Sequence, residues 1–165
     1  MGATRNVLPV LVDIARMAGQ DLSSGRVRTV CGGPAALRVY TPQELGINGV
    51  SLGSAVASVW VDVAGYRSLT AFIRIEGAPG SSVNLNLVAT PVGPGDTWGT
   101  PEQYQANIAA RASVNGPGVY IVANAGTQPT VSGTSWTGCI ARRAKIEVGA
   151  IGAGAQAWAY LLCLP

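Results

Sequence analysis

Apolar and polar residues alternate along most of the segment from residue 55 to residue 90. Within it, residues 59–63, 69–75 and 83–87 carry an apolar side chain at every second position. Gly65 lies in the first gap between these runs, and the turn-forming residues 77–80 fill the second. Strands with one buried face have a period of two residues, so the pattern predicts three consecutive antiparallel strands.

This pattern also predicts where two aromatic side chains lie. If the first hairpin is centred near Tyr66, Trp60 lies opposite Phe72 on a face that is otherwise polar. A cross-strand aromatic pair of this kind adds about 0.5–1 kcal/mol. Either another part of the same chain covers the two rings, or they contact a subunit or a ligand.

Residues 1–25 have a different pattern and are predicted to form a short helix or an extended arm. Leu8, Leu11 and Val12 recur near helical spacing, and Gly19 follows as a stop signal. A helix of this length is marginal alone, so we expect it to dock on its own domain or on a neighbour. The predicted division is an N-terminal segment, residues 1–25, and a β domain, residues 26–165.

Further short apolar runs follow from residue 26 onward, at 26–31, 36–40, 119–123, 139–148 and 156–164. The last run is apolar on both faces, which is typical of a central strand covered on both sides. Residues 41–49, 91–101 and 125–138 are predicted loops, and residues 102–113 are expected to be weakly helical or irregular. About eight strands result, which indicates an all-β, antiparallel β-sandwich of jelly-roll type.

Aromatic residues in the predicted loops and turns suggest a second kind of surface. Trp98 and Trp136 lie in two long loops, and Tyr66 lies at a predicted hairpin tip. These rings either cap the core or stack on sugar rings, with Asn84 and Asn86 as polar neighbours. Trp98 has a further alternative, as a contact residue on an outer surface of the protein.

The composition is unusually poor in charge. Only 12% of the 165 residues are charged, 48% are hydrophobic, 22 are glycine, and the net charge is +3. Either neighbouring molecules cover much of the surface, or uncharged polar residues replace charged ones. The basic residues are too scattered for us to expect nucleic-acid binding. We expect no membrane segment and no secretion signal, because no apolar run is long enough or suitably placed.

Candidate catalytic chemistry is scarce. The chain has no histidine, so the usual Ser-His-Asp and Cys-His sites cannot be built. The eight acidic residues form no evident pair across a cleft and no metal-binding pattern. We therefore expect no enzyme activity, no catalytic residue, no metal and no cofactor. Cys139 and Cys163 are either free buried thiols or a disulfide between neighbouring strands.

Residues 59–70, VWVDVAGYRSLT, resemble a strand-joining hairpin in small β-sandwich virion proteins of tailed bacteriophages. The resemblance covers this short stretch and includes no catalytic motif. It implies a jelly-roll-like fold, symmetric oligomers and contact with a capsid or tail surface, as in head decoration proteins, head fibres or tail appendages.

The leading hypothesis from the sequence is a non-enzymatic bacteriophage capsid decoration or minor capsid protein, made in the host cytoplasm and located in the virion. Its partners would be copies of itself, in a trimer for example, and a major capsid or tail protein. The hypothesised contact residues are Leu8, Leu11, Val12, Trp60, Phe72 and Trp98. The alternative is a carbohydrate-binding or host-attachment module, whose ligand residues would be Tyr66, Trp98 and Trp136.

Overall fold

The computed structural model of the chain describes residues 20–21, 28–29, 36–77, 83–114, 116–124, 128–131 and 138–165. These residues form two five-stranded antiparallel sheets. In sheet I the order is β10 (Gly118–Asn124), β7 (Ser68–Glu76), β14 (Gly152–Leu164) and β3 (Arg38–Tyr40), and β4 (Asn48–Leu52) also pairs with β14. In sheet II the order is β5 (Val56–Ala57), β13 (Arg143–Val148), β8 (Val83–Thr90) and β9 (Ala106–Val114), and β6 (Val61–Asp62) also pairs with β13.

Four shorter strands and two short helices complete the described elements. β1 (Gln20–Asp21) pairs with β2 (Arg28–Thr29), and β11 (Thr130–Val131) pairs with β12 (Cys139–Ile140). Helix α2 (Pro42–Leu45) connects β3 to β4, and the 3-10 helix η1 (Pro101–Tyr104) precedes β9.

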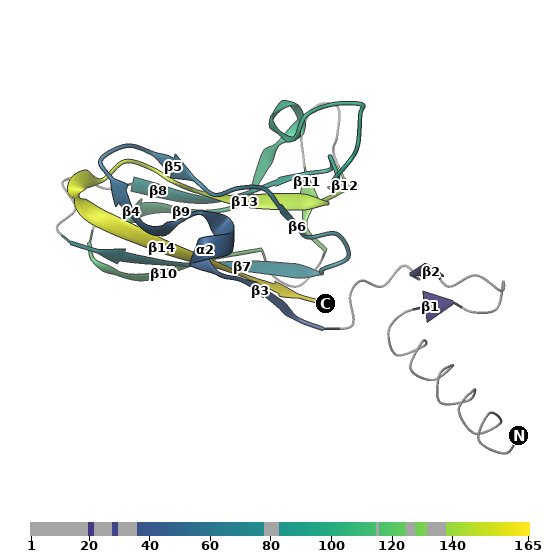
Figure 1. Cartoon of the computed structure of the whole chain (residues 1–165), viewed down its shortest axis with the longest axis horizontal. Helices are drawn as coiled ribbons and strands as arrows, with labels where there is room; N and C mark the ends of the chain where they lie inside the picture. Colours follow the sequence, from purple (N-terminus) through teal and green to yellow (C-terminus); the bar gives the residue numbers. More distant parts are fainter. Residues whose placement is uncertain are drawn as a thin grey trace, which may run out of the picture.

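The strand order is that of a jelly roll. β3 and β4 together form one broken edge strand of sheet I, and β5 and β6 form one of sheet II. Counting each broken edge as one strand gives the eight strands of this fold. Figure 1 shows the two layers, with β3, β7, β10 and β14 below β5, β8 and β13. The predicted all-β, jelly-roll-like sandwich is therefore confirmed.

The core lies between the two sheets and follows the predicted alternation. β7 buries Leu69, Ala71, Ile73 and Ile75, and β14 buries every second residue from Ala155 to Cys163. Sheet II faces them with Leu85 and Leu87 of β8 and with Ala144, Ile146 and Val148 of β13.

The predicted three-stranded meander is wrong. β6 pairs with β13, β7 pairs with β10 and β14, and β8 pairs with β9 and β13. The three runs are strands as predicted, but residues 59–70 connect the two sheets and do not form a hairpin. Trp60 therefore does not lie opposite Phe72, because alternation fixes which faces a strand has and not which strand it pairs with.

Three local predictions are also wrong. Within the predicted loop 41–49, Thr41 and Glu44 form a reciprocal capping box that starts α2, and Asn48 begins β4. Of residues 102–113, expected to be weakly helical or irregular, residues 106–113 belong to strand β9, and only residues 102–104 are helical, in η1. Residues 139–148 are predicted as one strand with Ile140, Ala144, Ile146 and Val148 on one face, but Cys139 and Ile140 form the separate strand β12, and Ile140 is 51% exposed.

The break in the sheet II edge is bridged by a buried serine. Ser58 lies between β5 and β6, its N–H donates to the carbonyl of Ile146, and its Oγ accepts from the N–H of Ile146 at 2.9 Å. The side chain thus satisfies a backbone donor of β13 at the point where the ladder is interrupted.

Candidate functional site

The outward side of sheet I is rich in exposed apolar side chains. In β7 and β14 the alternate residues Ala71, Ile73, Ala159 and Leu161 are buried, so the residues between them point outward. We use the name outer apolar face for these outward residues: Val39, Phe72, Val119, Ile121, Trp158, Tyr160, Leu162 and Leu164.

The strand register arranges this face in rows across the sheet. Ile121, Phe72 and Tyr160 form one row, since Phe72 is the direct partner of both other residues. Val39 and Leu162 form part of the next row. Ile121 is 50% exposed, Tyr160 is 41% exposed, and Val119, at the rim, is 64% exposed. The predicted double burial of the last strand is therefore wrong for this chain by itself: one face of β14 is in the core and the other is open.

The end of the face near the start of β14 is polar. The Arg74 guanidinium lies 4.6 Å from the centre of the Trp158 ring and forms an ion pair with Glu76. Both charged side chains are about half exposed, at 50% and 53%. Charge is thus confined to one end of the face, and the rows of Phe72 and Leu162 carry none.

The outward side of sheet II differs, because the chain's own β8–β9 connection covers part of it. Val88 points outward beside Lys145 and is nevertheless buried. The Trp60 indole N–H donates to the Glu102 carboxylate at 2.7 Å, and the Lys145 ammonium lies 4.8 Å from the Trp60 ring centre. The hydrogen bond from Trp60 is the main reason that the pKa of Glu102 lies below its ordinary value.

The loop that carries Trp98 is held by a second carboxylate. Asp96 accepts from the Gly93 N–H at 2.8 Å and from the Arg142 guanidinium at 2.7 Å. These contacts, the Gly93 bond first, lower the pKa of Asp96. Trp98 is 45% exposed and packs against Tyr104, with ring centres 5.1 Å apart.

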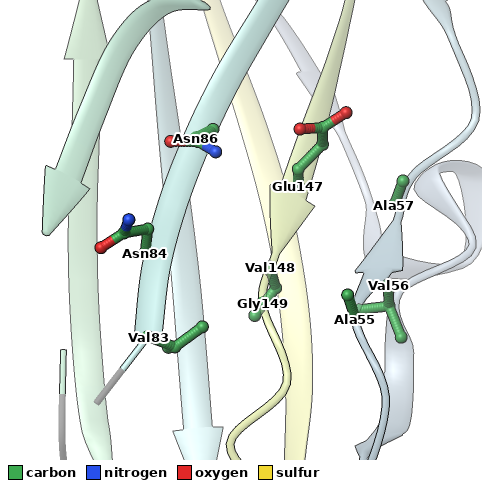
Figure 2. Close-up of a pocket in the computed structure, with 9 residues that line it drawn as sticks. All are labelled: Ala55, Val56, Ala57, Val83, Asn84, Asn86, Glu147, Val148 and Gly149. Carbon is green, nitrogen blue, oxygen red and sulfur yellow. The ribbon is translucent and has the colours of Figure 1, made fainter. Parts of the chain in front are cut away.

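A shallow groove lies at the other end of sheet II. Its volume is about 610 Å³, and Figure 2 shows Asn84, Asn86 and Glu147 along it. Glu147 pairs with the Lys145 ammonium at 2.8 Å and is the register partner of Asn86. The remaining lining is aliphatic and comes from residues of three neighbouring strands and their ends, Ala55, Val56, Ala57, Val83, Val148 and Gly149.

The predicted site residues are distributed over separate regions. Phe72 lies on the outer apolar face, whereas Trp60 lies against Lys145 on sheet II and Trp98 lies in the β8–β9 loop. Tyr66 packs against the hydrophobic core. Leu8, Leu11, Val12 and Trp136 lie outside the described residues. Most of the outer apolar face was missed, although the two-sided apolar pattern of β14 contained the signal.

The described residues contain no group of three His, Cys, Asp or Glu side chains that could hold a metal ion. Cys163 is a free, buried thiol at the end of β14, and burial raises its pKa to about 12. Such a thiol is a poor nucleophile. No helix within the described ranges is both long and apolar enough to span a membrane.

No protein-family model matches the chain, and no curated protein matches it. Solved structures with a similar fold include that of the SPBc2 prophage-derived protein YomS, at 11% identity and a TM-score of 0.41, covering 78% of this chain and 92% of that one. A second is that of infectious bursal disease virus, Gx strain, at 13% identity and a TM-score of 0.39, covering 87% of this chain and 37% of that one.

A third is the carbohydrate-binding module CBM27-1 of Caldicellulosiruptor saccharolyticus in complex with mannohexaose. Its identity is 8% and its TM-score 0.35, and the match covers 76% of this chain and 80% of that one. At these identities the likenesses concern the β-sandwich fold alone.

Proposed function

We propose that this chain is a non-enzymatic structural protein of a virus particle that acts by subunit contacts through its outer apolar face. The observation that carries the proposal is that β14, the central strand of sheet I, is apolar on both sides while only one side is buried. Exposed apolar side chains also lie on β10 and β3, and the half-buried Phe72 of β7 connects them to β14. Contiguous apolar patches of this kind typically mark surfaces that another molecule covers.

Three features of the sequence support the same function. Charged residues make up only 12% of the chain, histidine is missing, and residues 59–70 resemble a segment of tailed-phage virion proteins. Within that setting the chain is a bacteriophage decoration or minor capsid protein located in the virion. Many copies, each covering apolar area at about 25 cal/mol per Å², stabilise a shell together.

The direct test is mass spectrometry of gradient-purified particles from the strain that encodes the chain. The chain is expected in a fixed ratio to the major capsid protein. Particles assembled with Ile121→Asp should contain far less of it, whereas Ile140→Asp should be incorporated normally. Ile140 is a matched control, since it is 51% exposed against 50% for Ile121 and lies in β12. Absence of the wild-type chain from intact particles contradicts the proposal.

The alternative function is carbohydrate binding in the groove on sheet II. The observation that favours it is that three polar side chains, those of Asn84, Asn86 and Glu147, line the shallow groove. Amide and carboxylate groups can hydrogen-bond to sugar hydroxyls. Titration with a panel of neutral oligosaccharides tests it: saturable binding that Asn86→Ala weakens at least tenfold supports this function, and no binding by the wild-type chain at millimolar sugar excludes it.

A further inference from the structure

We propose that the occupant of the outer apolar face is a second copy of this chain, docked face to face about a two-fold axis that runs along the strands between β7 and β14. The inference rests on the proposed function, because it takes the same face as the contact surface. It adds the partner and the geometry.

The distribution of charge on the face favours a second copy over a foreign partner. The rows of Phe72 and Leu162 contain no charged residue, so they offer nothing for a charged partner to recognise. The two charges at the polar end, Arg74 and Glu76, already neutralise each other. Two copies of such a face therefore meet without like-charge repulsion.

The direction of the axis follows from the two unlike ends of the face. An axis along the strands brings polar end to polar end, where Arg74 and Glu76 remain at the solvent-exposed rim. An axis across the strands would instead place β7 over β7, so that Arg74 and Glu76 would lie over the opposite end of the face, at Thr70 and Ser68 beside Leu162 and Leu164 of the other copy. Covering a charged group with an apolar surface carries a desolvation penalty, so the first arrangement is favoured.

The same axis produces matched contacts at the centre. It places β7 of one copy over β14 of the other, and therefore Phe72 over Tyr160 twice, once on each side of the axis. Aromatic side chains at the centre of an interface are the residues that most often dominate binding. Thr70 then faces Leu162, and Arg74 faces Trp158.

The area of the face approaches what a specific dimer needs. Three strands of seven residues and the three residues of β3, at about 4.8 Å between strands and about 3.4 Å per residue, cover about 390 Å² on each copy. Two copies thus cover about 780 Å² as flat surfaces, and side-chain relief adds to this. Specific interfaces begin near 1,000 Å², so we expect a dimer that forms in a concentration-dependent way.

Sedimentation velocity of the full chain over a concentration series tests the pairing. The wild-type chain is expected to dimerise with increasing concentration. Ile121→Asp should weaken the association at least tenfold, and Ile140→Asp should leave it unchanged. If Ile121→Asp does not fold by circular dichroism, Val119→Asp replaces it, with Val59→Asp as its control; these valines are 64% and 55% exposed.

Cross-linking tests the axis. A mixture of Ala123→Cys and Val39→Cys chains, treated with a thiol-to-thiol cross-linker that spans about 10 Å, should give a linked pair of unlike chains, because the axis places β10 over β3 and packed sheets lie about 10 Å apart. Ile121→Cys alone should show no more linkage than the wild-type chain, because the two Ile121 positions then lie three strand spacings apart. A strictly monomeric wild type, equal effects of the two Asp substitutions, or efficient self-linkage of Ile121→Cys overturns the inference. Each of these results leaves the particle analysis unaffected, so the proposed function is judged separately.

Discussion

Gly77, at the end of β7, is a residue whose backbone permits only glycine for two separate reasons. Its φ is +89°, which disfavours residues with a Cβ, and a Cβ would overlap the carbonyl oxygen of Gly154 at the start of β14. Gly46 at the end of α2 has a similar φ, +76°, but nothing lies within 4 Å of its Cβ position. The two glycines therefore separate conformational cost from steric cost.

We expect Gly46→Ala to lower the free energy of unfolding by about 1 kcal/mol, the usual cost of left-handed backbone in a residue with a side chain. Gly77→Ala should cost about 3 kcal/mol, because the backbone of β14 must also move. Urea denaturation of both variants measures the difference. Equal losses in the two variants contradict the steric explanation.

Asp96 links the charge of one residue to the stability of the β8–β9 loop. Its pKa is lowered in the folded chain by the Gly93 N–H and by Arg142, so the folded state binds the proton less tightly than the unfolded state does. The stabilisation is complete at pH above the unfolded value, near 4, and is lost as the pH falls through the lower, folded value.

Asp96→Asn should therefore destabilise the chain at pH 7 and have a much smaller effect near pH 2. Urea denaturation of wild type and variant at both pH values gives the two differences. All other carboxyl groups titrate in both proteins and cancel in the comparison. A loss that is the same at both pH values would falsify the electrostatic role of Asp96.

At the scale of elements, the broken edge strands protect the sandwich. β3 has three residues, and β5 and β6 have two each, so these edges offer only short ladders of free backbone groups. Short, interrupted edges are a common way to prevent edge-to-edge aggregation. The interruption in sheet II leaves the N–H of Ile146 to be satisfied by the Ser58 hydroxyl.

Ser58→Ala should lower the free energy of unfolding by about 1–3 kcal/mol, because it leaves a buried backbone donor without a partner. Ser51→Ala is the control: that serine is exposed, and its hydroxyl donates to the Ala153 carbonyl at a long 3.4 Å. We expect a loss within about 0.5 kcal/mol there. Thermal or urea unfolding of both variants measures the effect. Similar losses of unfolding free energy in the two variants would contradict the bridging role of Ser58.

The sequence predicts which residues form strands far better than it predicts which strands pair with one another. The periods of β7, β8 and β13 are visible because each has one face in the core, and β14 is visible as a continuous apolar run. Their partners are not visible, because the same alternation suits a local hairpin and a crossing between sheets. β9 was missed since most of its side chains are exposed, and α2 because only Thr41 and Glu44 mark it.

At the scale of the whole molecule, the sequence predicts the sandwich but not where its free surface lies. Trp60 and Phe72 were placed together, yet one is tied to Glu102 over sheet II and the other belongs to sheet I. The apolar residues at every position of residues 157–164 predicted burial on two sides, but within this chain only one side is buried. A sequence alone does not show whether an apolar strand face is buried by the same chain or by another one.

Deletion of residues 1–25 is predicted to leave the β-sandwich folded, because the buried core of the described residues runs from Leu45 to Cys163. The expected result is a β-type circular dichroism spectrum and a melting temperature within a few degrees of wild type. Binding of the truncated chain to virus particles should be lost if residues 1–25 form a docking arm. Retained binding contradicts the arm, and loss of the β spectrum contradicts the division into a segment and a domain.

Alkylation of Cys163 can measure how often the end of β14 opens. The thiol lies on β14 between β3 and β7, its side chain is fully buried and its pKa is about 12. An alkylating reagent therefore reaches it only when β14 separates from its neighbours. The rate of Cys163 carbamidomethylation, measured on its peptide by mass spectrometry, therefore reports how often the C-terminal strand opens locally. If a second copy docks across the sheet, that rate should slow as the protein is concentrated.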